Sequence, residues 1–279
     1  MKKILVPTDF SASSKAGLRF AIQLASKCKV ELIFVHVFRL TRSPGQTDKE
    51  LEVYRRVRTE ALTLRLTNFV AGVYRYMQVA PENFTCQLLE GIGVDAVLID
   101  FCRSNKDIDL VCISTRGAGK FQKVLGTNAG NLISHSATPV MAVPAGYRIR
   151  ALKTILYATD FRDWDFESEK VREIAGQLAL PVEAVHFRSN GNTLPETVRL
   201  ADEYGWKIRV KDPAPGQSLF QSLRTYLFSN RPSIAILFTN QGRSFLQRLF
   251  QPSSAERLAF EIKTPLLVLS KRRPFAGMA

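Results

Sequence analysis

The sequence predicts an α/β fold in which two doubly wound parallel sheets follow each other along the chain as tandem domains. Three observations lead to this prediction. The chain repeats several of its own motifs in the same order, short apolar segments alternate with segments of helical periodicity, and 279 residues are enough for two domains of ordinary size.

The repeat is clearest at the start and at the end of each copy. Residues 4–10 read ILVPTDF where residues 155–161 read ILYATDF, and residues 138–144 read TPVMAVP where residues 264–270 read TPLLVLS. The offset between matching segments shrinks along the chain by about the length of one helix. The first copy therefore carries extra material in its middle.

These matches predict two domains and an insertion. The first domain is expected at residues 1–147 and the second, shorter one at residues 151–279. The extra material of the first copy is a long helical stretch at about residues 45–80.

Five short runs in the first copy predict buried strands, because they are continuously hydrophobic and often β-branched. They are Ile4–Pro7, Val30–Phe38, Phe84–Leu89, Leu110–Ser114 and Val140–Val143. Apolar strands that alternate with helices are typical of a parallel sheet covered on both faces. Right-handed crossovers then give a doubly wound, Rossmann-like arrangement.

Four segments between these strands predict helices. Ser11 or Ser13 can cap the first helix, in which Phe20 and Leu24 recur at helical spacing. The second helix is the long amphipathic stretch of the insertion. The four segments are Ser11–Cys28, Leu51–Met77, Val94–Cys102 and Gly126–Ser134.

A doubly wound sheet binds ligands at the carboxyl ends of its strands, near the point where the strand order reverses. This rule selects the residues at the ends of three predicted strands, which are Pro7, Thr8 and Asp9, then His36, Val37 and Phe38, and then Ser114–Gly119. Asp9 can contact a ligand or cap the following helix, and both interpretations stay open.

Glycines surround the predicted turn after the fourth strand. Gly117, Gly119 and Gly126 let backbone amides approach a phosphate without a Cβ in the way. The next helix begins with Thr127 and Asn128, and its first amides and its dipole favour an anion. Arg116 adds a positive charge nearby. The pattern favours a phosphate site, although the same glycines also suit a plain turn.

The motifs of this chain resemble those of the universal stress protein family. The resemblance rests on the start ILVPTDFS, on VHV at the end of the second strand, and on the segment STRGAGKFQKVLGTNAGNLISHSATPVMAVP. It covers residues 1–147 and, more weakly, residues 151–270. The duplication resembles that of bacterial tandem members, the Bacteroidetes type among them.

The resemblance implies a five-stranded sheet in each copy and a dimer-like pairing of the two copies through their last strands. It also implies a role in stress tolerance. One branch of the family binds ATP through a loop of the form Gly-x2-Gly-x9-Gly-Ser/Thr. Its nucleotide contacts correspond to Pro7, Asp9, Val37, Ser114, Gly117, Gly126, Thr127 and Asn128. We therefore expect ATP, with Mg²⁺, or a related adenine nucleotide in the first copy.

Two departures from that loop favour an alternative. Ser114 stands where the family has its first glycine, and eight residues instead of nine separate Gly117 from Gly126. The alternative is a scaffold that binds protein partners or a small ligand but no nucleotide. In the second copy, Pro252 lies at the loop and lacks an amide donor, so no ATP is expected there.

No complete catalytic constellation accompanies these residues, so we expect no enzyme, or at most a slow ATPase. His36 and His186 lie at equivalent strand ends, and neither has a recognisable partner for proton transfer. A structural role is the simpler interpretation of both. Asp160 is expected to cap a helix, and no ligand spacing predicts a metal site.

Charge and cysteine content limit the partners and the location. The net charge is +14, but the basic residues are scattered in short groups, so a polyanion site is the less favoured interpretation and nucleic acid is not expected. The four cysteines form no CxxC pair, and no apolar run suits a membrane span or a signal sequence. We expect a cytoplasmic protein and leave a homodimer and unidentified protein partners open.

Overall fold

Ten strands of the described residues form the centre of the molecule, five from each half of the chain. The computed structural model describes residues 1–115, 127–188, 204–239 and 263–271. The first half contributes β1 (Lys3–Pro7), β2 (Glu31–Phe38), β3 (Phe84–Glu90), β4 (Ile108–Ser114) and β5 (Val140–Val143). The second half contributes β6 (Ile155–Ala158), β7 (Val182–Phe187), β8 (Lys207–Lys211), β9 (Ile234–Thr239) and β10 (Leu266–Ser270).

The strands form one continuous sheet in the order β3-β2-β1-β4-β5-β10-β9-β6-β7-β8. Neighbours within each half are parallel, and the two halves meet where β5 pairs antiparallel with β10. We call this pairing the central seam. It aligns Ala142 with Leu266 and Val140 with Val268, so both halves share a single sheet.

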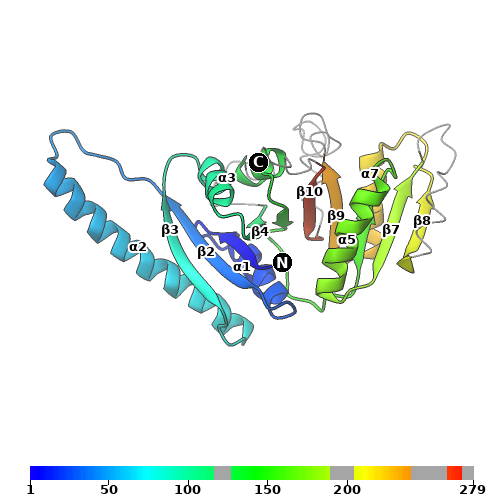
Figure 1. Cartoon of the computed structure of the whole chain (residues 1–279), viewed down its shortest axis with the longest axis horizontal. Helices are drawn as coiled ribbons and strands as arrows, with labels where there is room; N and C mark the ends of the chain where they lie inside the picture. The colour runs from blue at the N-terminus through cyan, green and yellow to red at the C-terminus, as the bar shows by residue number, and fades with distance from the viewer. Residues whose placement is uncertain (116–126, 189–203, 240–262, 272–279) are drawn as a thin grey trace, which may run out of the picture.

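Helices cover both faces of this sheet (Figure 1). They are α1 (Lys15–Ala25), α2 (Asp48–Met77), α3 (Val94–Ser104), α4 (Thr127–His135), α5 (Trp164–Leu178) and α7 (Leu219–Asn230). Buried side chains of α1, α2 and α5 belong to one hydrophobic cluster. Those of α3, α4 and α7 belong to a second cluster on the other face. The two clusters account for the continuously apolar strands, which are buried on both sides.

The predicted fold class is confirmed, since two half-sheets of five parallel strands with helices on both faces follow each other along the chain. The five strands of the first copy lie within two residues of their predicted bounds. The domain boundaries at residues 147 and 151 stay a prediction.

The predicted cap of the first helix is wrong. The helix begins at Lys15, and Ser14 occupies the cap position without a hydrogen bond from its side chain to the helix. The Ser14 hydroxyl instead bonds the Ser11 carbonyl oxygen at 2.9 Å and lies 2.8 Å from the Thr8 hydroxyl. The serines of this segment therefore stabilise the turn after β1 and leave the first turn of the helix uncapped.

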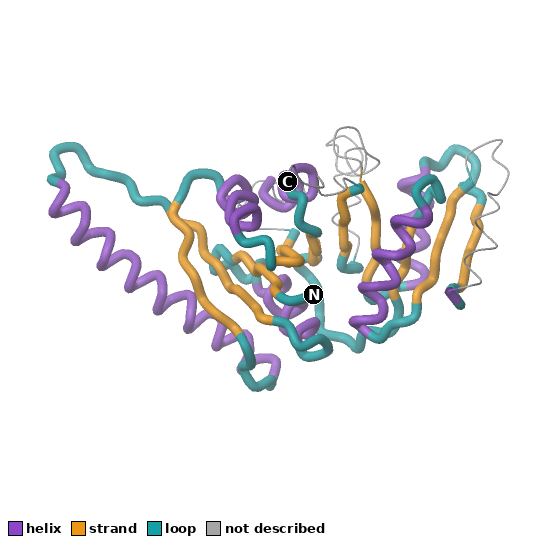
Figure 2. The backbone as a smooth tube through the Cα atoms, in the orientation of Figure 1, coloured by secondary structure: helices purple, strands orange, loops and turns teal. Residues whose placement is uncertain are grey.

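The extra length of the first copy is found in the connection between β2 and β3, which spans residues 39–83, whereas the connection between β7 and β8 spans residues 188–206. Thr47 and Glu50 form a reciprocal capping box at the start of α2. The buried side chains of α2 begin at Leu62, and its first turns extend away from the sheet (Figure 2). None of the helices in the described ranges is long and apolar enough to cross a membrane.

The central seam supplies a test of the fold. Leu267 of β10 is 3% exposed and pairs with Met141, so Leu267→Ala removes buried methyl groups at the junction. We expect a loss of about 2–5 kcal/mol in the free energy of unfolding, measured by urea denaturation. Leu64→Ala, at a side chain that is 64% exposed on α2, is the control and should cost under about 0.5 kcal/mol. Equal effects of both variants would contradict a seam packed as a core.

Candidate functional site

The candidate site lies where the strand order of the first half reverses, between β1 and β4. In the order β3-β2-β1-β4-β5 the chain leaves β1 toward β2 on one side and returns through β4 on the other. The carboxyl ends of β1, β2 and β4 therefore lie together at one edge. Val37 and Ser114 lie at this edge near the ends of β2 and β4, and Thr8 and Asp9 follow directly after β1.

A tight turn follows β1, and its side chains hold it. Phe10 has a positive φ of 62°, which is uncommon for a residue other than glycine. The Phe10 amide donates to the Thr8 hydroxyl at 3.1 Å, and the Ser11 amide donates to the Asp9 carboxylate at 2.9 Å. The Thr8 side chain is 6% exposed and thus serves the turn, while Asp9 is exposed at its surface.

The second half repeats this turn after β6. Phe161 also has a φ of 62°, its amide donates to the Thr159 hydroxyl at 2.9 Å, and the Arg162 amide donates to the Asp160 carboxylate at 3.1 Å. Asp160 therefore caps this turn, whereas the cap position of α5 is Asp163. The repeated Thr-Asp-Phe sequence thus encodes a backbone turn in both halves, whether or not either half binds a ligand.

The two strand-end histidines are part of the same unit. A ring nitrogen of His36 bonds the Thr8 carbonyl at 2.8 Å, and that of His186 bonds the Thr159 carbonyl at 2.9 Å. The Phe10 ring lies 4.2 Å from the His36 ring. Burial lowers the pKa of His36, and the charges of Arg65 and Arg58 lower it further, against the opposing Thr8 hydrogen bond. His36 is thus a structural residue, as its sequence position indicates.

Ser114, the last residue of β4, is crowded by α1. A Cβ on Gly17 of α1 would lie only 3.0 Å from the Ser114 backbone nitrogen, so helix and strand approach closely here. Ser114 is 8% exposed, and its hydroxyl has no hydrogen-bond partner in the described part of the chain. A buried hydroxyl without a partner is costly, which marks this edge as a place where a ligand group could add a hydrogen bond.

The remaining predicted site residues divide into two groups. In the first group, Pro7 is buried at the end of β1, and Val37 is half-buried against the hydrophobic cluster under α3. Thr127 is the first residue of α4, and Asn128 is partly exposed on that helix. The others, Arg116, Gly117, Gly119 and Gly126, lie outside the described residues. The structure therefore describes the strand ends of the predicted nucleotide site but not its glycine loop.

The second half has a different side chain at the corresponding edge, and the sequence analysis did not predict this difference. Ser114 pairs with Val143, and Phe238 pairs in the same way with Leu269, so Phe238 occupies the place of Ser114. The Phe238 ring lies 5.9 Å from the Tyr157 ring. An aromatic side chain thus fills the position at which the first half has a serine.

A buried polar cluster lies beside Phe238. Glu167 is 2% exposed, accepts a hydrogen bond from the Tyr157 hydroxyl, and lies 2.7 Å from the Lys271 ammonium. Lys271 also pairs with Asp163 at 2.7 Å. Burial raises the pKa of the Glu167 carboxyl, while the hydrogen bonds from Lys271 and Tyr157 act in the opposite direction.

The repeat carries a signal that could have revealed this cluster. At the offset that aligns the two Thr-Asp-Phe motifs, Tyr157 and Glu167 correspond to Val6 and Ala16. Both first-half residues are fully buried. A tyrosine and a glutamate at core positions of a repeat require partners, and Lys271 supplies the charge. The described part of the chain contains no group of three or more His, Cys, Asp or Glu residues that could hold a metal ion.

Comparison with known proteins gives one family and several similar structures. The model of the universal stress protein family matches residues 1–144. A universal stress protein from Archaeoglobus fulgidus is similar over 96% of this chain and 96% of its own, with 15% identity and a TM-score of 0.64. A functionally unknown protein from Pseudomonas aeruginosa is similar over 97% of this chain and 92% of its own, with 13% identity and a TM-score of 0.58. No curated protein matches the chain. At such identities the structural similarities show the fold.

The buried cluster predicts a pH-dependent cost. Lys271→Met leaves the Glu167 carboxylate buried without its cation, and we expect a loss of about 3–5 kcal/mol at pH 7.5, measured by urea denaturation. In this variant the pKa of the folded-state Glu167 lies further above its value in the unfolded chain. The loss in unfolding free energy should therefore shrink toward pH 5, where the Glu167 carboxylate takes up a proton more easily. Adding Glu167→Gln should recover stability at pH 7.5.

A surface pair provides the matched control for this prediction. Lys170 and Glu173 lie 3.3 Å apart with both side chains about half exposed. Lys170→Met should therefore cost under about 1 kcal/mol at either pH. A pH-independent cost for Lys271→Met would refute the proposed role of the Glu167 charge.

The lowered pKa of His36 predicts a second pH effect. His36 binds a proton more readily in the unfolded chain than in the folded one. Its contribution to stability is therefore fully present above about pH 6.5 and decreases as the pH falls below that value. His36→Asn should flatten the dependence of the melting temperature on pH between pH 7.5 and 5, whereas His186→Asn keeps His36 and should retain this contribution. If His36→Asn and the wild type show the same slope, His36 is not the titrating group.

Proposed function

Because the chain belongs to the universal stress protein family, we propose that it is a stress-response binding and regulatory protein whose first half binds an adenine nucleotide, ATP with Mg²⁺. The observation that supports this proposal best is the meeting of Asp9, Val37 and Ser114 at the edge where the strand order reverses. That edge is the usual ligand position in doubly wound sheets.

Each residue of this edge has a role in the proposed site. The exposed Asp9 carboxylate accepts a hydrogen bond from the ribose or the adenine, and half-buried Val37 offers an apolar contact to the base. The Ser114 hydroxyl, which lacks a partner in the described ranges, can bond the ligand. Pro7 is buried at the end of β1, and Thr8 holds the turn that presents Asp9.

The phosphates are assigned to the loop and to the start of α4. Gly117, Gly119 and Gly126 leave room for backbone amides, and the helix that begins at Thr127 directs its first amides and its dipole toward an anion. Asn128 and Arg116 add a polar group and a charge. A bound Mg²⁺ would neutralise phosphate charge.

The second half is proposed to bind no ATP and to serve as the pairing partner of the first. Phe238 and the Tyr157–Glu167–Lys271 cluster occupy its corresponding edge. The central seam is then the counterpart, within one chain, of a dimer formed through the last strands. The four free cysteines support a cytoplasmic location. A further homodimer or a protein partner is compatible with this proposal.

Two specific observations favour a second candidate, a scaffold for protein partners or a small ligand that binds no nucleotide. Ser114 stands in the place of a family glycine on a strand end whose backbone approaches α1 closely, and the spacing from Gly117 to Gly126 is one residue short. Either change could exclude phosphates from the loop. Nucleotide binding by the intact chain distinguishes the two candidates.

Isothermal titration calorimetry with ATP, with and without Mg²⁺, tests the proposed function. We expect one nucleotide per chain, and at least tenfold weaker binding for Gly117→Val and for Asp9→Asn. The repeat supplies matched controls, because Gly242→Val and Asp160→Asn make the same changes in the second half and should leave binding within twofold of wild type. Absence of ATP binding by the wild type would favour the scaffold, and equal losses in both halves would indicate a general structural effect.

A further inference from the structure

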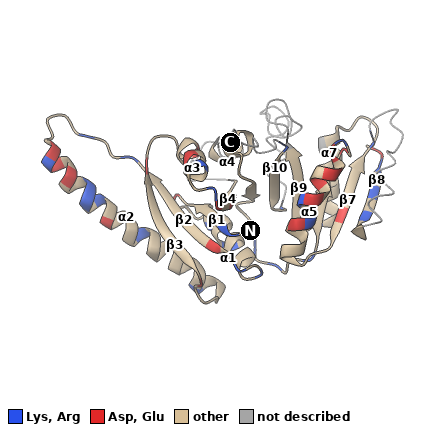
Figure 3. Cartoon of the chain, in the orientation of Figure 1, with Lys and Arg blue, Asp and Glu red and all other residues tan. Residues whose placement is uncertain are grey.

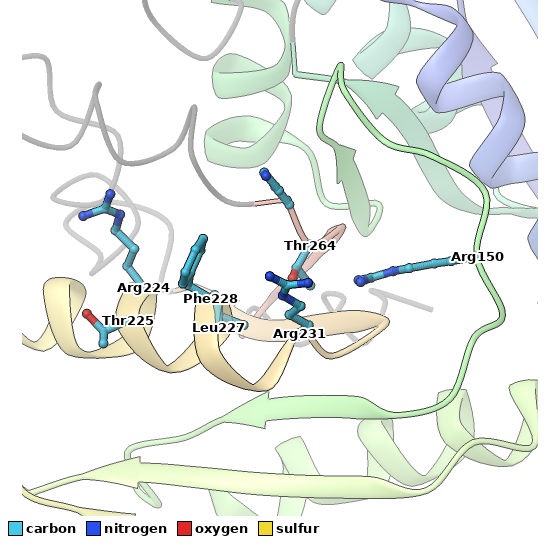
Figure 4. Close-up of a pocket in the computed structure, with 8 residues that line it drawn as sticks. Arg150, Arg224, Thr225, Leu227, Phe228, Arg231 and Thr264 are labelled. Atoms are coloured by element: carbon cyan, nitrogen blue, oxygen red, sulfur yellow. The ribbon is translucent and has the colours of Figure 1, made fainter.

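A second candidate site lies in the other half of the molecule, where no nucleotide is expected. A cavity of about 390 Å³ is found where the segment linking the halves meets the end of α7 and the start of β10. Its volume is within the range of small-ligand pockets. The residues that line it are Arg150, Arg224, Thr225, Leu227, Phe228, Arg231, Lys263 and Thr264 (Figure 4).

The cavity is strongly cationic. Four of its eight described lining residues are basic and none is acidic. Arg150 extends from the linking segment toward Arg231 and Thr264 (Figure 4), and it donates to the Pro232 carbonyl at 2.7 Å. Arg231 lies 5.9 Å from the Phe228 ring. Within the described ranges, Arg150, Arg231 and Lys263 form no ion pair with a carboxylate.

The charges elsewhere in the fold are arranged differently. At the amino end of β1, Lys3 pairs with Asp107 at 2.8 Å and with Glu31 at 3.5 Å. Acidic and basic residues also follow each other closely along α2 and α5 (Figure 3), where Glu52 pairs with Arg55 and Lys170 pairs with Glu173. By contrast, the sequence of α7, LFQSLRTYLFSN, contains no acidic residue. Helix α7 therefore offers no carboxylate to the cavity, and within the described ranges Arg150, Arg231 and Lys263 are three cations of one cavity that no carboxylate pairs with.

Clustered cations repel one another, and a bound anion removes that repulsion. Arginine suits this role because its planar guanidinium makes paired hydrogen bonds to phosphate or carboxylate oxygens. Buried Leu227 and exposed Phe228 form an apolar wall, and Thr225 and Thr264 add hydroxyl groups. This combination suits a compact ligand with several negative charges better than a single weakly charged ion.

We propose that this cavity binds a small polyanion of the phosphate class, such as a diphosphate group, at a site separate from the proposed nucleotide site. The two sites share no residue, since the nucleotide site draws on β1, β2, β4 and α4, whereas the cavity draws on the linking segment, α7 and the approach to β10. The proposal therefore stands whether or not the first half binds ATP. In this proposal, some of the basic residues that produce the net charge of +14 form a binding site.

Calorimetric titration of the full chain with inorganic pyrophosphate tests this proposal. The cavity variant combines Arg231→Asn with Lys263→Gln, because asparagine tolerates the left-handed backbone at position 231, where φ is 45°. The control combines Arg148→Gln with Lys153→Gln, which removes the same charge from exposed residues of the linking segment. Gly117→Val is included to detect binding of pyrophosphate at the nucleotide loop.

We expect pyrophosphate to bind the wild type, the control and Gly117→Val with affinities within threefold of one another, and the cavity variant at least tenfold more weakly. Binding should weaken between 50 and 200 mM salt. No binding by the wild type, or a loss in Gly117→Val alone, would overturn the proposal. A twenty-base-pair duplex DNA is titrated in parallel, and binding of DNA without binding of pyrophosphate would also overturn it, in favour of a nucleic-acid surface.

Discussion

The antiparallel pairing of β5 with β10 is the interaction on which the architecture depends. It joins two parallel half-sheets into one sheet and reverses the strand direction at the middle. The carboxyl end of β5 consequently lies beside the amino end of β10. The proposed nucleotide site of the first half and the cationic cavity before β10 therefore face the same edge of the sheet. The Tyr157–Glu167–Lys271 cluster, which follows the carboxyl end of β10, lies at the opposite edge.

The two halves share a backbone arrangement and differ in the side chains that pack around it. The turn after β1 and the turn after β6 have the same φ at phenylalanine and matching hydrogen bonds, so the Thr-Asp-Phe sequence adopts the same geometry in both halves. Around these turns the chemistry diverges. Apolar Val6 and Ala16 are matched by Tyr157 and Glu167, whose burial is tolerated because Lys271 and the mutual hydrogen bond compensate the charge.

Local and periodic features could be predicted from the sequence, whereas distant polar contacts could not. The apolar runs predicted the strands of the first half because burial on both faces requires them, and the repeat predicted the tandem arrangement. The predicted cap of α1 was wrong because the Ser14 hydroxyl bonds Thr8 and Ser11 and makes no hydrogen bond to the helix. Lys271 and Glu167 lie far apart in the sequence, as do Arg150 and Lys263, so only the folded chain reveals their neighbours. The site prediction at the glycine loop stays a prediction, since that loop is outside the described residues.

Covalent connection changes what a paired arrangement can do. Two separate subunits that meet through identical strands must carry every substitution on both sides, and they separate on dilution. With β5 and β10 in one chain, the effective concentration of one half at the other is set by the linking segment and is independent of how much protein is present. Each side can then mutate independently. One half can keep the motifs of the family while the other acquires a buried carboxylate and a cationic cavity. A symmetric pair of domains then becomes a molecule whose two halves differ in chemistry.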